Sequence, residues 1–192
     1  MNQRTKFPQF VDVDEIVDLY HHWGGEYYSE DVTQTVHAVQ AAELAIAAGA
    51  SDELVAAALL HDVGHLVDLA ENGPRPEAFD TDLRHEAVGV RMLALLFPVL
   101  VTAPIALHVD AKRWRCAVDA GYLMTLSDAS MRSLVLQGGR MTREEQARFE
   151  AHPQFRAAVQ LREWDDSAKV VGRDDPGFEH FIPLLHRVLL DS

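Results

Sequence analysis

Apolar residues recur every three or four positions along most of the chain, and this spacing constrains the fold more than any other feature of the sequence. Near the N-terminus the pattern runs through Phe10, Ile16, Val17 and Tyr20, and no segment alternates convincingly with a period of two. Spacings of three and four place side chains on one face of an α-helix, whereas a half-buried strand needs alternation. The pattern therefore predicts an all-α protein.

Residues that start and stop helices divide this pattern into segments. We expect the first helix to end at HHWGG (residues 21–25), and Asp31 to cap the second, with Gln34 as its capping-box partner. Gly49 should stop that helix, and Ser51 or Asp52 should cap the next. Helices after the first are expected over residues 33–49, 53–70, 81–97, 104–114, 127–136, 142–151, 153–171 and 177–190.

Length, charge and cysteine content limit the class of protein. The 192 residues fit one domain, and the formal net charge of −13 argues against nucleic-acid or anionic-membrane partners. The most apolar stretch, Met92 to Leu107, is too short to span a membrane and is cut by Pro98 and Pro104, the second of which should open a new helix. The single cysteine, Cys116, excludes an internal disulfide and is interpreted as a small packing residue. We expect a soluble, cytoplasmic protein.

Ionisable side chains interrupt the apolar pattern at LLHDVGHLV (residues 59–67). A single histidine in such a frame is more often a hydrogen-bonded core residue than a metal ligand. Here, however, several histidines fall on predicted helices beside small or aliphatic residues: His37, His61, His65, His85 and His108. Burying that many imidazoles without a shared purpose would leave many donors and acceptors to satisfy, so a common site is the better interpretation.

The adjacent pair His61 and Asp62 can serve two metal ions, because a carboxylate has two oxygens whereas an imidazole binds one ion. On one helix the two side chains point about 100° apart, so ligands from other helices must meet them. A late carboxylate comes from Asp165 or Asp166, and we interpret Asp166 as a solvated or capping group. Imidazole and carboxylate ligands together suit iron, manganese or zinc. The residues therefore indicate a dinuclear site.

The order of these residues resembles that of a known family. A histidine, then a His-Asp pair, then a late aspartate is the order of the HD-domain metalloproteins, and the extra histidines at 85 and 108 are similar to the dinuclear branch. The chain most resembles the phosphonate-cleaving diiron oxygenases of the PhnZ type, relatives of myo-inositol oxygenase. The likeness runs from Tyr27 to Lys169 through DVTQTVHAVQAA, ALLHDVGH, RHEAVG, LHVDAKRW, SDASMRSLVLQGG and LREWDDSAK.

The resemblance implies a single HD-domain helical bundle over residues 1–192, with a dinuclear metal site in its core. An N-terminal helix and flexible loop (1–26) would precede the metal and substrate region (27–169), and a C-terminal helix (170–192) would follow. The ligands of one iron would be His37, His61, Asp62 and Asp165. Asp62 would bridge to a second iron held by His85 and His108.

The resemblance also implies which residues hold a phosphonate group: His65, Lys112, Ser130 and Arg162. Lys112 follows His108 by four residues and Arg162 precedes Asp165 by three, so each cation would lie one helical turn from a metal ligand. An arginine fork and a lysine point charge both suit phosphonate oxygens. The alternative is that Lys112 and Arg162 are ordinary surface cations with neighbouring carboxylates.

The loop GGEYYSEDVTQ precedes the helix that carries His37. In the family that the chain resembles, a loop tyrosine can occupy an iron position until substrate displaces it, and a glutamate three residues later contacts the amino end of the substrate. Tyr27 and Glu30 match that spacing, which leaves Tyr28 without an assigned role. The alternative is a surface loop with a packing tyrosine.

Together these features lead to one expected function and two alternatives. The resemblance implies an Fe(II)/Fe(III) and O2-dependent oxygenase that cleaves the C–P bond of a 1-hydroxy-(2-amino or 2-trimethylammonio)ethylphosphonate to glycine or glycine betaine and phosphate. The catalytic group would include Tyr27, Glu30 and His65, and the protein would be a monomer or weak homo-oligomer. An HD-type metal-dependent phosphohydrolase acting on a phosphate ester or nucleotide uses the same ligand order. A regulatory module that has lost catalysis is disfavoured, because every ligand position is filled.

Overall fold

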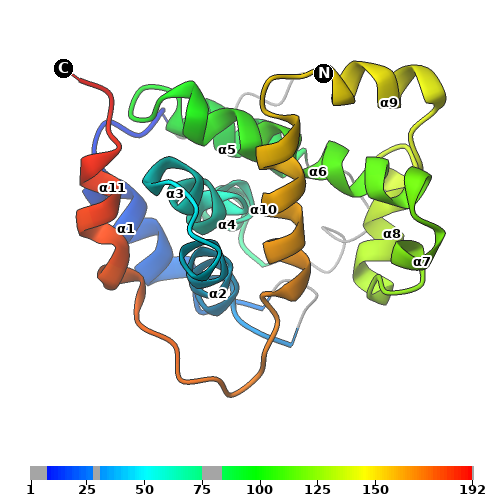
Figure 1. Cartoon of the computed structure of the whole chain (residues 1–192). Coiled ribbons are helices and arrows are strands. Elements are labelled where there is room, and N and C mark those ends of the chain that lie inside the picture. The colour runs from blue at the N-terminus through cyan, green and yellow to red at the C-terminus, as the bar shows by residue number, and fades with distance from the viewer. Residues whose placement is uncertain (1–7, 28–30, 75–83, 192) are drawn as a thin grey trace.

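The computed structural model describes residues 8–27, 31–74 and 84–191, and this part of the chain is built from helices (Figure 1). It contains an isolated antiparallel bridge between Tyr27 and Thr33 but no strand, so the expectation of an all-α fold is confirmed. The helices are α1 (Val13–Trp23), α2 (Gln34–Ala47), α3 (Asp52–Leu60), α4 (Val63–Asn72), α5 (His85–Leu93), α6 (Val99–Val118), α7 (Ala120–Leu123), α8 (Asp128–Leu136), α9 (Arg143–Glu150), α10 (Phe155–Ser167), the 3-10 helix η2 (Phe178–Phe181) and α11 (Ile182–Arg187).

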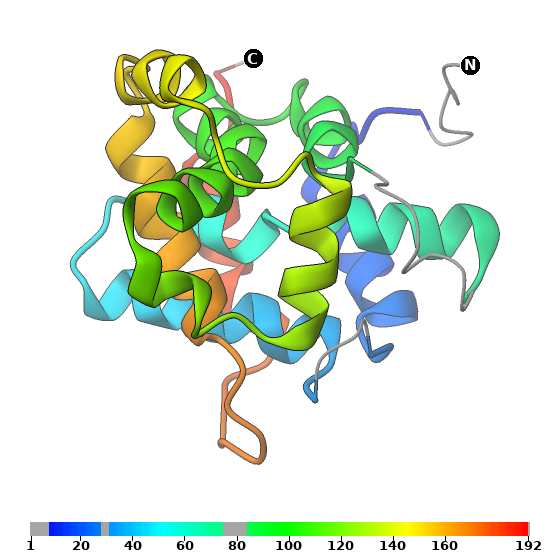
Figure 2. The same ribbon diagram turned by 90° about the vertical axis from the view of Figure 1, so that its right-hand side faces the viewer.

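Helix α3 lies in the middle of the molecule, and α4 extends behind it in the view of Figure 1. Helix α6 packs against α10, α5 and α3, and α2 packs against α3 and α10. Helices α1 and α11 lie on one side of this group and α7, α8 and α9 on the other, with α8 facing the viewer when the molecule is turned (Figures 1 and 2). The core lies between these helices, with fully buried side chains that include Ile16, Leu59, Leu66, Ile105 and Leu161.

Side-chain caps begin several of the helices, and the predicted cap and stop residues are confirmed in part. Ser51 caps α3 by accepting from the N–H of Leu54, and Gly49 follows α2 with a φ of 71° that favours glycine. The predicted cap of α2 is wrong: Thr33, rather than Asp31, is the N-cap and accepts from the N–H of Val36 at 3.3 Å. Thr33 takes this place because it immediately precedes the first helical residue.

Several predicted segments differ from the observed helices. The segment 53–70 is two helices, broken at His61 and Asp62, although its apolar pattern continues across the break because both halves are buried. Helix α6 already begins at Val99, since Pro98 supplies the extended residue before it, and Pro104 lies inside the helix. The predicted helices 81–97 and 153–171 end earlier, at Leu93 and Ser167.

Two further expectations concern the cysteine and the membrane. Cys116 is buried beside Tyr122 and Leu134, which confirms that it is a packing residue. None of the helices in the described ranges is long and apolar enough to cross a lipid bilayer.

Candidate metal centre

The chain turns sharply between α3 and α4, at the His-Asp pair. Asp62 has φ −101° and ψ 9°, and α4 begins at the next residue. Gly64 then allows α4 to approach the start of α5, because a Cβ atom on Gly64 would lie 2.0 Å from the carbonyl oxygen of His85. The break and the glycine together bring an imidazole from α5 beside the carboxylate of Asp62.

Four side chains from different parts of the chain form the first group: His37 of α2, His61 and Asp62 at the break, and Asp165 of α10. The Nε2 atoms of His37 and His61 are 3.2 Å apart. Oδ2 of Asp62 lies 3.6 Å from each of these nitrogens. Oδ1 of Asp165 lies 3.4 Å from Nε2 of His37 and 3.8 Å from that of His61. All four predicted ligands of the first iron therefore meet around one space.

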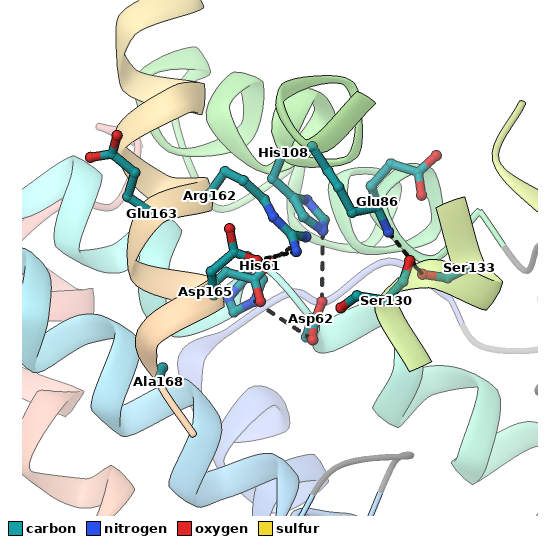
Figure 3. A network of polar contacts seen from close by, with 12 residues as sticks. His61, Asp62, Glu86, His108, Ser130, Ser133, Arg162, Glu163, Asp165 and Ala168 are labelled. Carbon is teal, nitrogen blue, oxygen red and sulfur yellow. Dashed lines mark hydrogen bonds and ion pairs between the residues drawn. The ribbon is translucent and has the colours of Figure 1, made fainter. Parts of the chain in front are cut away.

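The other oxygen of Asp62 faces a second group. Its Oδ1 lies 3.3 Å from Nε2 of His85 and 3.8 Å from Nε2 of His108, and these two nitrogens are 3.0 Å apart. Figure 3 shows Asp62 between His61 and His108, with a contact to each. The ring of His65 stacks on that of His85, with centroids 3.9 Å apart, so His65 lies at the edge of this group.

Backbone carbonyls accept hydrogen bonds from Nδ1 of three of these imidazoles. The pairs are His37 with Ala168 (2.9 Å), His61 with Ala58 (2.8 Å) and His108 with Ile105 (2.7 Å). Because Nδ1 donates in each pair, the neutral ring carries its lone pair on Nε2, toward the centre. The fold thus orients these rings as ligands.

This arrangement fits a metal ion in each group. Two Nε2 lone pairs that face each other at 3.0–3.2 Å repel unless a metal ion or a proton lies between them. Ligand atoms that lie about 2.1 Å from one ion at right angles are about 3.0 Å apart, close to the observed spacing. The donors are imidazoles and carboxylates, which suit iron, manganese or zinc. Asp62 offers one oxygen to each group.

The protonation of these side chains follows from their burial and mutual charges. Burial and then the charge of His85 lower the pKa of His108 to about 3, which keeps this ring neutral as a ligand requires. Burial disfavours the charged form of His61, but Asp62 and Asp165 outweigh burial and raise its pKa to about 9. Despite burial, the neighbouring cationic groups hold the pKa of Asp62 and Asp165 well below the ordinary value. In the metal-free protein a proton on His61 therefore offsets the negative charge of Asp62 and Asp165, as a bound metal ion would.

Two buried cations lie beside the metal-binding residues. Lys112 is 3% exposed, and its Nζ donates to Oγ of Ser133 at 2.8 Å. Arg162 is 4% exposed and donates to Oδ2 of Asp165 at 2.8 Å (Figure 3). Ser130, on α8, is buried near Ser133. The alternative of ordinary surface cations is wrong for both, because each is almost completely buried.

The sequence pattern did not predict Tyr122, which accepts from Arg162, or Arg115, which donates to Asp166, and the environment of Asp166 itself was predicted wrongly. Asp166 was expected to be solvated or capping, but it accepts hydrogen bonds from Arg162, Arg115 and Tyr122. Its spacing of four from Arg162 is the signal that could have revealed this pair. Tyr122 is 40 positions from Arg162 and Arg115 is 51 positions from Asp166, so no helical periodicity connects them.

The loop before α2 is only partly described. Tyr27 is 65% exposed and is not buried against the metal-binding residues, so its expected contact with a metal stays a prediction. Glu30 and Tyr28 lie outside the described residues. Of the predicted site residues that the structure describes, all except Tyr27 lie in or beside the centre.

Comparison with known proteins gives a family and three relatives. The model of the HD domain family matches residues 36–151. The chain is 46% identical to a hydroxymethylphosphonate dioxygenase of Gimesia maris over 169 residues, which cover 88% of this chain and 84% of that protein. It is 37% identical to the glycine-betaine-forming [1-hydroxy-2-(trimethylamino)ethyl]phosphonate dioxygenase of Leisingera caerulea, covering 85% and 83% of the two chains. An uncharacterized protein of Acanthamoeba polyphaga mimivirus is 31% identical, covering 94% and 83%.

Proposed function

The chain belongs to the HD-domain family, and from that premise we propose that it is an O2-dependent oxidoreductase that cleaves the C–P bond of a small 1-hydroxyphosphonate. Two of its relatives are named as dioxygenases of such compounds. We further propose that its metal is iron and that the site holds two ions.

The observation that carries this proposal is the division of Asp62 between two groups of imidazoles. Oδ2 of Asp62 faces His37 and His61, whereas Oδ1 faces His85 and His108. Two iron ions held by these residues would supply the redox chemistry by which O2 oxidises a carbon atom. The ligand order alone is also compatible with hydrolysis. The names of the two relatives favour oxygenation.

The buried cations suit the phosphonate end of such a substrate. Arg162 can offer a planar pair of N–H groups and Lys112 a compact charge, both inside a low-dielectric site where their attraction for an anion is strong. Ser130 lies near the partner of Lys112 and can add a hydroxyl donor. In a chain of net charge −13, these residues would provide the local positive field that an anionic substrate needs.

Hydroxymethylphosphonate is the substrate that we propose first. It has no tail beyond the hydroxylated carbon, so it requires no contact from the exposed Tyr27 or from Glu30. The 2-amino and 2-trimethylammonio ethyl compounds are the alternatives, for which that loop would have to supply a carboxylate or an aromatic face.

The overall reaction with hydroxymethylphosphonate balances without another reductant. One molecule of the phosphonate dianion and one O2 give formate, hydrogen phosphate and one proton. The carbon loses four electrons, which O2 accepts, and the carbon–phosphorus bond breaks. Lys112 and Arg162 would hold the phosphonate before this change and the phosphate after it, so inorganic phosphate should compete with the substrate.

The test is to incubate iron-loaded protein with hydroxymethylphosphonate, (R)-2-amino-1-hydroxyethylphosphonate and its trimethylammonio analogue. O2 uptake and phosphate release are followed together, and we expect them in equal amounts with at least one compound. An anaerobic sample serves as the control and should release no phosphate. Release of phosphate from nucleotides without O2, and none from the phosphonates, would support the phosphohydrolase instead.

A further inference from the structure

Partners from three directions surround the guanidinium of Arg162. Its NH1 atom donates to Oδ2 of Asp165 at 2.8 Å, and its NH2 atom donates to Oδ1 of Asp166. Its Nε atom donates to the hydroxyl of Tyr122 at 3.1 Å. Of the five N–H bonds in a guanidinium, these contacts use three, which leaves one on NH1 and one on NH2 for a ligand.

Tyr122 and Asp166 are themselves tied together. The hydroxyl of Tyr122 donates to Oδ2 of Asp166 at 2.7 Å while its oxygen accepts from Arg162, so the phenol has one partner for each role. Burial raises the pKa of Tyr122, which keeps the donating proton in place. Arg115 closes the network, with its guanidinium 3.9 Å from the centroid of the Tyr122 ring and 3.2 Å from Oδ2 of Asp166.

The network has a fixed position because its members come from separate helices. Tyr122 belongs to the short helix α7, which Asp119 caps by accepting from two backbone N–H groups. Arg115 comes from α6, whereas Arg162 and Asp166 come from α10. Side chains from three helices thus fix a guanidinium that would otherwise rotate about its flexible stem.

The network also adjoins the proposed anion site. Tyr122, Arg115 and Asp166 line a cavity of about 470 Å³, and Ser130 lines the same cavity. Within α10 the carboxylate of Glu163 points away from the metal centre (Figure 3), so the acidic partners of Arg162 are its neighbours at 165 and 166.

From this geometry we propose that Tyr122 and Asp166 are positioning residues for Arg162. They would fix the plane of its guanidinium so that the two remaining N–H bonds face the phosphonate before it binds. This inference rests on the proposed function, because it takes Arg162 to hold the anionic end of the substrate. A flexible donor that is already oriented loses less conformational entropy when the ligand binds, so affinity is higher.

The decisive variant is Tyr122→Phe, which keeps the aromatic ring under Arg115 and removes only the hydroxyl. For the phosphonate that the wild-type protein turns over, we expect KM to rise about tenfold or more, because a hydrogen bond to a charged group is lost. Since Asp165 keeps its place, iron content should stay unchanged and kcat should remain within about twofold of wild type. Calorimetry with inorganic phosphate on the same iron-loaded samples should show the same loss of affinity without turnover.

The matched control is Glu145→Gln, which removes the carboxylate partner of a different arginine. Glu145 accepts from Arg113 at 2.7 Å, away from the metal centre, so this variant should leave KM and phosphate affinity unchanged. A lower Tm and kcat in Tyr122→Phe with a wild-type KM would show a merely structural role and overturn the inference. Absence of turnover of every 1-hydroxyphosphonate by the wild-type protein would contradict the proposed function itself, so the two failures are distinguishable.

Discussion

Oδ1 of Asp62, at the break between α3 and α4, lies 3.3 Å from Nε2 of His85, at the start of α5. This contact joins the second group of imidazoles to the first. We expect His85→Ala or His108→Ala to remove about one metal ion per chain. Each variant deletes one of the two imidazoles whose Nε2 atoms face Oδ1 of Asp62, so the second group loses a ligand. Metal analysis of the purified variants checks this, with the exposed His186→Ala as the control that keeps the wild-type content. Two ions still bound in both site variants would contradict the ligand assignment.

The approach of α4 to α5 makes Gly64 a second test. A Cβ atom there would lie 2.0 Å from the carbonyl oxygen of His85, and a backbone atom cannot move aside as a side chain can. Gly64→Ala should therefore lower the free energy of unfolding by about 3 kcal/mol, at the upper end of overpacking costs, and should weaken binding of the second ion.

Gly89→Ala is the control for Gly64→Ala, because Gly89 lies on α5 and faces α4 at the same contact. Its Cβ atom would meet Cγ1 of Val63 at 3.1 Å, a side chain that can shift. We expect its stability to stay within about 1 kcal/mol of wild type, because the gain in helix propensity offsets the tighter contact. Denaturant unfolding measures both variants, and equal losses would refute the close contact at Gly64.

Gln40 holds the segment that orients His37. Its side chain donates to the carbonyl of Val170 at 2.8 Å and accepts from the N–H of Val170 at 2.9 Å, two residues beyond the carbonyl of Ala168 that receives Nδ1 of His37. Gln40→Met should weaken metal affinity by about tenfold, since partners that orient a ligand usually have effects of this size.

The control for Gln40 is Gln146→Met. Gln146 also donates to a backbone carbonyl, that of Met141, but lies away from the metal-binding residues. Its metal affinity, measured by competition with a chelator, should equal that of wild type. Unchanged metal affinity in Gln40→Met would mean that Ala168 keeps its position without the two hydrogen bonds between Gln40 and Val170.

Lys112 should lower stability below pH 8 in return for anion binding. Burial and then the charge of Arg162 lower its pKa from 10.5 to about 8. Between pH 8 and 10.5 the unfolded chain holds a proton on Lys112 that the folded protein has released, so stability rises with pH across this range. Below pH 8 the cost of burying the charged lysine is fully present. The shift corresponds to about 3 kcal/mol.

Lys112→Met removes that charge. At pH 7 the metal-free variant should be more stable than wild type by about 3 kcal/mol, and the difference should shrink as pH approaches 10.5. KM for the phosphonate should rise, because an anion loses a buried cation. Urea unfolding between pH 6.5 and 9.5 measures the trend, and Lys112→Arg, which keeps a charge, should show no such gain. A difference that does not change with pH would exclude Lys112 as its source.

Local signals in the sequence were enough for the fold class and for several helix ends. The apolar spacing predicts helices, and the cap at Ser51 is correctly located because a capping hydroxyl bonds within three residues of its own position. The members of the metal centre could also be named in advance, since buried imidazoles in an apolar pattern are unusual. The residues alone indicated a dinuclear site, but the family resemblance was needed to say which ligand belongs to which ion.

The break at Asp62 and the surroundings of Arg162 depend on tertiary structure. Apolar residues continue across the break because α3 and α4 are both buried, so the pattern contains no sign that the chain turns there. Tyr122 meets Arg162 only because α7 and α10 are brought together, across 40 positions of sequence. Periodicity describes the face that one helix presents, whereas the distance between side chains on different helices is decided by how those helices pack. The sequence therefore determined which residues are available for the site, and the packing decided which oxygen of Asp62 each histidine faces.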